Sequence, residues 1–193
     1  TRDYIFRSTK WSLKRLNTDY LDILSVHLKD GLDPKPGPPE FQLGGGHTDD
    51  AVREIYMRLY KDPFPTPSEE IVDSMNALVQ SGKIRYWGLS QHNSEEVSDY
   101  LRIAEETGKI PIASLQNNYS ILSQGRMAEE LLPVMKEANL GVQTIGPHGS
   151  GAAVKGNESE LDPKRYMIVK ALDRVATDLG VTRAQVCVAW VLS

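Results

Sequence analysis

Short apolar runs alternate with longer amphipathic segments along this chain. Five of the runs are rich in β-branched, aromatic and leucine residues, and none alternates cleanly between apolar and polar positions. That pattern is typical of strands that are buried on both faces. The predicted strands are Tyr4–Ser8, Asp22–His27, Arg85–Ser90, Ala113–Tyr119 and Gly141–Gly146. The pattern therefore favours a sheet that is covered by helices over a sheet with one face in water.

Most segments between these runs have helical periodicity and recognisable ends. Polar or acidic residues and prolines mark the starts, and glycines mark the ends. The predicted helices lie between Ser68 and Gly82, Ser94 and Gly108, Pro133 and Gly141, Asp162 and Gly180, and from a capping box at Thr182 and Gln185 onward. Strands that alternate with helices predict a parallel α/β fold. The pattern does not decide between a (β/α)₈ barrel and a doubly wound sheet. Five strands are fewer than the barrel needs, and no G-x-G-x-x-G follows a strand to indicate the doubly wound sheet.

Two places break the regular alternation. Only Thr9–Leu21 separates the first two predicted strands, which is marginal for a parallel crossover. Either these strands do not form a normal βαβ unit, or residues are missing between Lys10 and Trp11. The second place is residues 28–67, a long insertion that contains PKPGPP and GGG and in which Asp49–Leu59 is a candidate short helix. Insertions of this length are typical of functional lids or mobile loops.

Composition narrows the class of protein. The chain has 193 residues, of which 40% are hydrophobic and 25% charged, and its net charge of −4 argues against a nucleic-acid-binding domain. No apolar run reaches the length of about 18 residues that indicates a membrane span. The single cysteine, Cys187, excludes an intrachain disulfide and favours a cytoplasmic setting. The chain starts at Thr1 with no visible leader and no initiator Met, so we expect it to be part of a longer protein.

Several stretches together resemble the aldo-keto reductases. They are SLKRLNTDYLDILSVH (Ser12–His27), SGKIRYWGLS (Ser81–Ser90), LQNNYSIL (Leu115–Leu122) with ELLP (Glu130–Pro133), and AQVCVAWVLS (Ala184–Ser193). Their order and spacing match across nearly the whole chain. The family fold is a (β/α)₈ barrel of roughly 300 residues or more. The resemblance thus implies that residues 1–193 are one incomplete barrel domain, with strands three to seven and the 28–67 insertion.

The resemblance also implies the chemistry of a carbonyl reductase. The family's catalytic set is Asp, Tyr, Lys and His; Lys10, at the end of RSTK, matches the Lys, and His27, at the end of DILSVH, matches the His. The Asp and the Tyr match nothing in this chain. In this chemistry a hydride passes from a nicotinamide, expected here as NADPH, to the carbonyl carbon of an aldehyde or ketone. A neutral His stabilises the charge that grows on the oxygen, and a Tyr whose pKa is lowered by Lys⁺ donates the proton.

The expected contacts to the nicotinamide depart from the family pattern. A Ser-Asn pair and a Gln hold the carboxamide in the family, and they match Ser90, Gln91 and Gln116 here. A Gln offers the same amide groups as an Asn, displaced by one methylene. An aromatic residue normally stacks on the nicotinamide ring, but Ile145 stands at that position and offers only apolar surface.

The segment after the last predicted strand is the expected phosphate loop. Ile145, Gly146, Pro147 and His148 match the family's Tyr-Ser-Pro-Leu stretch at the nicotinamide, and the next segment, GSGAAVKG (Gly149–Gly156), matches the loop that crosses the pyrophosphate. Its backbone N–H groups are suited to an anion nest to which Lys155 adds charge, although a flexible glycine-rich loop is the alternative. His148 replaces an apolar residue, and it is either a new acid–base group or a loop histidine without a role.

The departures keep a second hypothesis open. In that hypothesis the protein is an aldo-keto-reductase-like scaffold with weak or lost redox activity, used for regulation or for another reaction. The potassium-channel β subunits show that the fold serves as a channel partner. A metal site is a third option because His47, Asp49 and Asp50 cluster in the long insertion. HTDD lacks the spacing of a zinc motif, so we predict no metal site.

Overall fold

The computed structural model describes residues 1–27, 66–125, 127–154 and 161–193. Helices alternate with strands through most of this part of the chain. In order, the elements are α1 (Arg2–Leu16), β1 (Leu21–His27), α3 (Ser68–Gln80), β2 (Ile84–Ser90), α4 (Ser94–Glu106), β3 (Ser114–Asn118), a π-helical turn (Met127–Leu131), α5 (Leu132–Glu137), β4 (Gly141–Ile145), α6 (Pro163–Leu179) and α7 (Arg183–Leu192).

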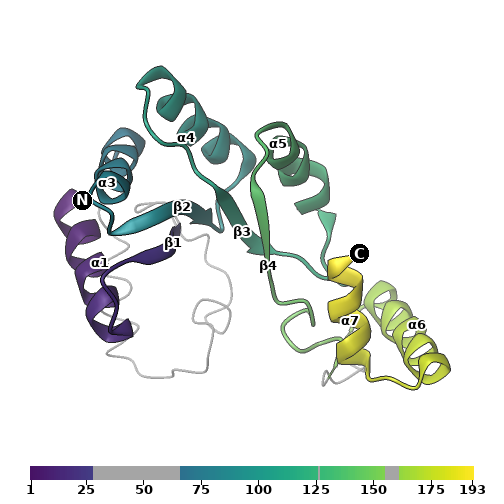
Figure 1. Ribbon diagram of the computed structural model, residues 1–193. Helices are drawn as coiled ribbons and strands as arrows, with labels where there is room; N and C mark the ends of the chain where they lie inside the picture. The colour runs from purple at the N-terminus through teal and green to yellow at the C-terminus, as the bar shows by residue number, and fades with distance from the viewer. Residues whose placement is uncertain (28–65, 126, 155–160) are drawn as a thin grey trace, which may run out of the picture.

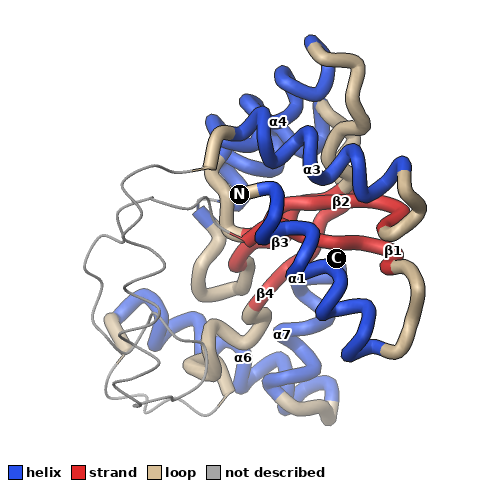
Figure 2. Tube along the Cα trace, turned by 90° about the vertical axis from the view of Figure 1, so that its left-hand side faces the viewer, coloured by secondary structure: helices blue, strands red, loops and turns tan. Residues whose placement is uncertain are grey.

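The strands form one parallel sheet in the order β1-β2-β3-β4. Helices α1, α3, α4 and α5 lie around the outside of the curved sheet, whereas α6 and α7 lie beyond β4 (Figure 1). Figure 2 shows the same arrangement from the side, with α3 and α4 above the strands. Because all of these strands are parallel, their carboxyl ends lie at one edge of the sheet. The prediction of a parallel α/β fold is confirmed.

The predicted strand Tyr4–Ser8 is wrong, because these residues lie in the first half of α1. Ile5 and Phe6 look like part of a strand in isolation, but with Thr9 and Leu13 they form one face of a helix. Thr9 and Leu13 are buried, and Ile5 and Phe6 pack against the main core. A short apolar run does not distinguish strand from helix, and here the 3.6-residue period continues for the full length of α1.

This correction removes the abnormal crossover. Lys10 and Trp11 are consecutive residues in the middle of α1, so no residues need to be missing between them. The helix ends at Asn17, which adopts a left-handed conformation with φ of 52° and donates its N–H toward Lys14. The chain then passes directly into β1. The segment Thr9–Leu21 is therefore the second half of a helix with its turn, and no parallel crossover is required of it.

The other four predicted strands are confirmed, each to within about one residue at either end. The helix ends are confirmed with two changes. The helix predicted between Pro133 and Gly141 ends earlier, at Glu137, because Asn139 adopts a left-handed conformation with φ of 53°, and Gly141 is the first residue of β4. Asn93, and not Ser94, caps α4: its Oδ1 accepts from the Glu96 N–H at 2.8 Å, and the Glu96 carboxylate accepts from the Asn93 N–H at 2.9 Å. The predicted capping box of Thr182 and Gln185 is present at the start of α7. Local sequence signals were sufficient at these places because the partners are three residues apart.

The two faces of the sheet have different characters. The outer face, which meets the helices, carries Trp87, Leu89 and Leu115, each with 0% of its surface exposed. They pack with α3 and α4 residues such as Met75 and Tyr100 in the main hydrophobic core. Side chains alternate along a strand, so the residues between them lie on the opposite, inner face. The inner face carries Gly88, Ser90, Ser114, Gln116 and Gln143.

A second, much smaller cluster lies among the last elements. Ala153, Leu172 and Cys187 are its buried members. Burial raises the pKa of the Cys187 thiol, an effect that the nearby Arg183 opposes. No single described helix is long and apolar enough to cross a membrane; α6 and α7 pass the length and composition test only as a pair, which is bent by 99°.

Candidate functional site

Four polar residues lie in one row across the sheet, which passes through the carboxyl-terminal ends of β1 and β2 and the middle of β3 and β4. His27 is in register with Ser90, Ser90 with Gln116, and Gln116 with Gln143. Residues in register on neighbouring parallel strands point to the same face, so the row lies on the inner face. Functional residues of parallel α/β folds gather at this end of the strands. The row is therefore the candidate site, and it contains three of the predicted residues.

Hydrogen bonds join most of this row into a chain that we call the inner-face ladder, formed by Ser90, Gln116, Gln143 and Ser114. The Ser90 Oγ donates to Gln116 Oε1 at 3.1 Å, and Gln116 Nε2 donates to Gln143 Oε1 at 3.2 Å. Gln143 Nε2 donates in turn to Ser114 Oγ at 3.0 Å. Sequence reasoning missed Gln143 and Ser114. The available signal was that both are polar residues at alternate positions of strands that otherwise look buried.

Gly88 allows two strands of the ladder to approach closely. A Cβ atom added at Gly88 would lie 2.6 Å from Ser114 Oγ and 2.7 Å from the Ser114 carbonyl oxygen. Gly88 and Ser114 are in register on β2 and β3. Any side chain at position 88 would therefore displace Ser114, which is the end of the ladder.

The turn after β2 places Gln91 above the row. Gln91 adopts a left-handed conformation with φ of 64°, and its N–H donates to the Gln116 carbonyl at 2.9 Å. Asn118, which lies two residues beyond Gln116 in β3, donates from Nδ2 to Gln91 Oε1 at 3.4 Å. Since the Gln91 oxygen has this partner, its Nε2 donor group remains for a ligand. The Gln91 side chain is thus held in part by β3.

A buried histidine, His92, contacts the main chain of this turn. His92 is fully buried, and its Nδ1 lies 3.0 Å from the Ser90 carbonyl oxygen. Asn117 Nδ2 donates to the His92 carbonyl at 2.9 Å, and Tyr100 of α4 meets the imidazole edge-on with ring centroids 5.6 Å apart. The sequence analysis did not single out His92, since a histidine beside a strand end has no local signature of a structural role. Here its contacts fix the main chain that carries Ser90 and Gln91.

The predicted phosphate loop begins directly after β4. Ile145 ends that strand in register with Asn118, and Gly146 follows with φ of 69°. The loop closes on itself, since Gly149 N–H donates to the Gly146 carbonyl at 2.8 Å. His148 is partly buried; its Nε2 has almost no exposed surface and no hydrogen-bond partner in the part of the chain that the structure describes. Buried polar atoms normally have partners, so His148 Nε2 stands out among the described residues of this segment.

Not every predicted site residue joins this group. Lys10 is exposed on α1, and the strand end on which its catalytic assignment depended does not exist. Lys155, most of the 28–67 insertion with its candidate helix Asp49–Leu59, and the HTDD cluster lie outside the described residues. The structure thus brings together His27, Ser90, Gln91 and Gln116, and it places the Ile145–His148 segment at the neighbouring strand end. It does not bring Lys10 to them.

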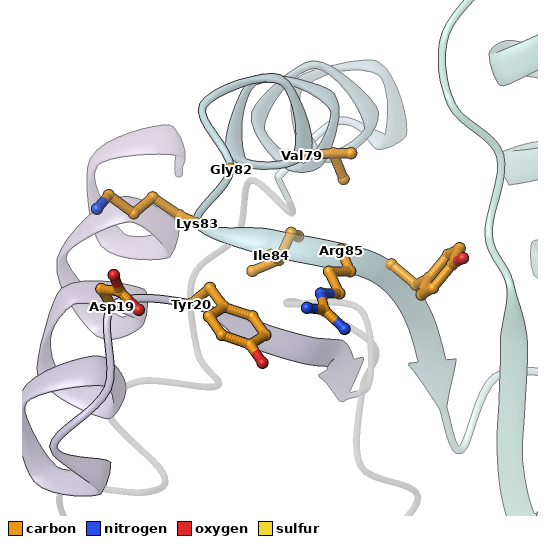
Figure 3. Close-up of a pocket in the computed structure, with 8 residues that line it drawn as sticks. Asp19, Tyr20, Val79, Gly82, Lys83, Ile84 and Arg85 are labelled. Atoms are coloured by element: carbon orange, nitrogen blue, oxygen red, sulfur yellow. The ribbon is translucent and has the colours of Figure 1, made fainter.

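A cavity of about 610 Å³ lies elsewhere, at the amino-terminal ends of β1 and β2 (Figure 3). The Arg85 guanidinium lies 4.4 Å from the centre of the Tyr20 ring and 3.1 Å from an Asp22 oxygen. This ion pair is exposed and the cavity is open to solvent, so the attraction is weak. Because ligands of parallel α/β folds bind at the opposite end of the strands, the candidate site is the polar row and not this cavity.

Comparison with known proteins gives a consistent family. A family model described as the Aldo/keto reductase family matches residues 1–193. An aldo-keto reductase of Babesia bovis is 28% identical over 145 residues, which cover 75% of this chain and 48% of that protein. A probable voltage-gated potassium channel subunit beta of Oryza sativa subsp. japonica is 25% identical over 213 residues, covering 100% of this chain and 55% of that protein. An aldo-keto reductase of Alternaria alternata is 26% identical over 208 residues, which cover 98% of this chain and 47% of that protein.

The chain spans about half the length of the curated relatives it matches. The family fold is a (β/α)₈ barrel, and the parallel four-stranded sheet with helices on its outside is consistent with part of such a barrel. The predicted fold class is thereby confirmed, with four strands in the described residues where five were expected. The family model matches the whole chain, and the chain belongs to the aldo/keto reductase family.

Proposed function

We propose that the full-length protein binds a nicotinamide cofactor, NADPH in the first instance, and reduces an aldehyde or ketone to an alcohol. The observation that carries this proposal is the row of His27, Ser90 and Gln116, in register on three adjacent strands of an aldo/keto reductase chain, where His27 and Ser90 end β1 and β2. The free Cys187 thiol and the absence of disulfides favour the cytoplasm as its location. The identity of the carbonyl substrate depends on loops beyond this row.

The residues at the site suit a nicotinamide carboxamide. A carboxamide needs at least one hydrogen-bond donor and one acceptor from the protein. Gln91 Nε2 supplies donors, and the partly buried Gln116 amide keeps one N–H and one lone pair beyond those used in the ladder. Ser90 is only 2% exposed, so its main contribution is to hold Gln116. The Ile145 side chain supplies apolar surface for the ring, without the π-face of the family's aromatic residue.

His27 is the residue that we place at the reacting carbonyl oxygen. When bound, the reduced nicotinamide supplies the hydride. His27 is exposed at the end of β1, where its imidazole is free to donate a hydrogen bond to a substrate oxygen. Negative charge grows on that oxygen as the carbonyl carbon accepts the hydride, and a donor already in place stabilises the charge without reorganisation. Lys10 has no part in this proposal, because its position on α1 removes the argument for it.

Cofactor titration tests the proposal directly. The full-length protein is titrated with NADPH and, separately, NADH while tryptophan fluorescence is followed. We expect saturable quenching below about 1 mM, the upper end of ordinary affinities of enzymes for their substrates, with NADPH the tighter ligand. Oxidation of the bound NADPH on addition of simple aldehydes is then followed at its absorbance band. Saturable binding with turnover supports the reductase; no binding of either cofactor contradicts it.

A second function is favoured by one specific observation. Ile145 cannot stack on a nicotinamide ring, and one relative is named as a probable potassium channel subunit beta. The alternative is therefore a scaffold that binds the cofactor weakly or not at all and regulates a partner. Substitution of Ile145 by Tyr distinguishes the two functions. A gain of turnover in I145Y from an inactive wild type supports the scaffold, whereas a wild type that already turns over supports the reductase.

A further inference from the structure

The inner-face ladder contains two residues that the expected carboxamide contacts do not include. Gln143 accepts a hydrogen bond from Gln116 and donates one to Ser114, so Ser114 is linked to Gln116 only through Gln143. Gln143 lies on the far side of Gln116 from Ser90. Gln143 is partly buried on the inner face, in a strand whose outer-face neighbour is Thr144. A partly buried amide needs hydrogen-bond partners. The Gln143 amide has one at each end, Gln116 at its oxygen and Ser114 at its nitrogen.

The orientation of the Gln116 amide depends on Gln143. The last torsion of a glutamine side chain is broad, so an amide turns over easily unless both of its ends are held. Ser90 alone does not prevent that, because a hydroxyl both donates and accepts and would bond either end of the amide. Gln143 does prevent it: if Gln116 turned over alone, two amide oxygens would face each other across the present 3.2 Å contact. The two amides therefore keep their orientations together.

We propose that Gln143 is a positioning residue that couples the orientation of the Gln116 amide to its own, so that Gln116 turns over only if Gln143 turns with it and otherwise presents one N–H and one lone pair to the carboxamide of the nicotinamide. This inference rests on the proposed function. Gln143 itself touches no ligand in this account; it acts through Gln116, and Ser114 anchors its other end at 3.0 Å. The consequence is selectivity for a primary carboxamide over groups of the same shape that lack the N–H.

The test compares two cofactors in four proteins. The cofactors are NADPH and its reduced 3-acetylpyridine analogue, in which a methyl group replaces the carboxamide NH₂. The proteins are the full-length wild type, Gln143→Leu, Gln143→Glu and the control Thr144→Val, whose change lies next in sequence on the outer face of the same strand. Dissociation constants are measured by fluorescence in the absence of substrate. Q143E keeps an acceptor for Gln116 Nε2, so it is the conservative variant expected to restore function.

We expect the wild type, T144V and Q143E to bind NADPH about fivefold more tightly than the analogue, the scale of one neutral hydrogen bond. In Q143L the preference falls to about twofold or less, because the released amide adapts to either ligand. A Q143L protein that keeps the full preference overturns the positioning role alone. A wild type that binds neither cofactor overturns the proposed function as well, so the two failures are distinct.

A second readout does not depend on a cofactor. In ¹⁵N-labelled protein, one side-chain amide proton of Gln116 should exchange slowly with solvent in the wild type and in T144V, because it is bonded to Gln143. The protection should be lost in Q143L and kept in Q143E. Equal exchange in all four proteins would contradict the inference. If Q143L does not fold, Gln143→Met replaces it with a flexible side chain of similar length and the same loss of hydrogen bonds.

Discussion

The outer and inner faces of the same sheet differ in what their residues do. On the outer face, Trp87, Leu89 and Leu115 are completely buried against helices, and their contacts are apolar. On the inner face, Ser90, Gln116 and their partners are joined by directional hydrogen bonds at the carboxyl ends of the strands. One face holds the helices to the sheet and the other carries the candidate chemistry. Because side chains alternate along a strand, each strand of seven residues or fewer serves both faces.

This difference means that the faces should respond to substitution in different measurements. Burial of apolar surface is a term in the free energy of unfolding, so outer-face changes should lower stability. The inner-face groups at the strand ends hold few apolar contacts, so changes there should alter binding or turnover first. The exception is Gly88, where β2 and β3 lie so close together that an added inner-face side chain would disturb the packing of the sheet.

The largest effect is expected for Trp87→Ala on the outer face. Trp87 is fully buried, donates from Nε1 to the Ile110 carbonyl at 2.9 Å and meets Tyr100 edge-on. Its truncation should lower the free energy of unfolding by about 3–5 kcal/mol, measured by urea denaturation. Trp87→Phe is the matched control, which keeps an aromatic ring and most of the apolar burial but loses the hydrogen bond and the second ring of the indole, so its loss of stability should be smaller. A W87A protein as stable as the wild type would show that the outer face does not hold the fold.

The next effect is expected for His27→Ala on the inner face, and it should appear in activity. Loss of one preplaced donor to a developing oxyanion costs about 100-fold in kcat, close to 2.7 kcal/mol of transition-state stabilisation. The dissociation constant for NADPH and the melting temperature should change little, since His27 is exposed. His27→Gln retains an N–H donor and should recover part of the rate. Equal turnover in wild type and H27A would remove His27 from the mechanism.

Gly88→Ala should lower both stability and cofactor binding, although Gly88 lies on the inner face. The new Cβ would lie within 2.7 Å of the Ser114 Oγ and carbonyl oxygen, so the strands must separate. We expect a loss of about 1–3 kcal/mol of stability, typical of overpacking, together with weaker cofactor binding. Adding Ser114→Gly removes the side-chain clash but not the clash with the carbonyl, so it should restore stability only in part. Full restoration would mean that the main-chain contact is not limiting.

The smallest effect is expected for Asn93→Ala, at the turn where β2 passes into α4. This change removes the N-cap acceptor for the Glu96 N–H, which should cost about 1 kcal/mol of stability. Asn93→Asp retains an acceptor and should be close to the wild type. Cofactor binding should be unchanged, because Ser90 and Gln91 are held by β3 and by His92 as well. A clear loss of binding in N93A would show that the cap, and not the sheet, positions the site.

Much of the fold was readable from sequence wherever its causes are local. The capping box at Thr182 needs only Gln185, and the end of α6 needs only Gly180 with its φ of 66°. Four strands were located because buried apolar runs flanked by turn residues have few other interpretations. Tyr4–Ser8 was the exception, since a run of that length fits a strand or one turn of a helix, and only the packing of Thr9 and Leu13 decides between them.

The residues of the candidate site were also predictable from sequence only in part. The resemblance to a known family singled out His27, Ser90, Gln91 and Gln116. The structure places His27 and Ser90 at the ends of β1 and β2, in register with each other, and Gln91 in the turn that follows; Gln116 lies beside them in β3. It also offered Lys10, which the structure moves to an exposed face of α1. That error had a physical cause, because a lysine at the end of RSTK is at a strand end only if the preceding residues form a strand.

The sequence by itself determined the alternation of elements, the positions of most caps and the polar residues that end the strands, because these depend on neighbours a few residues away. The tertiary structure alone decided which of those residues meet. Gln116 and Gln143 are 27 positions apart, and their contact depends on the register of β3 with β4. A shift of register by one residue would move one of them to the other face. The ladder is thus a property of the sheet as a whole.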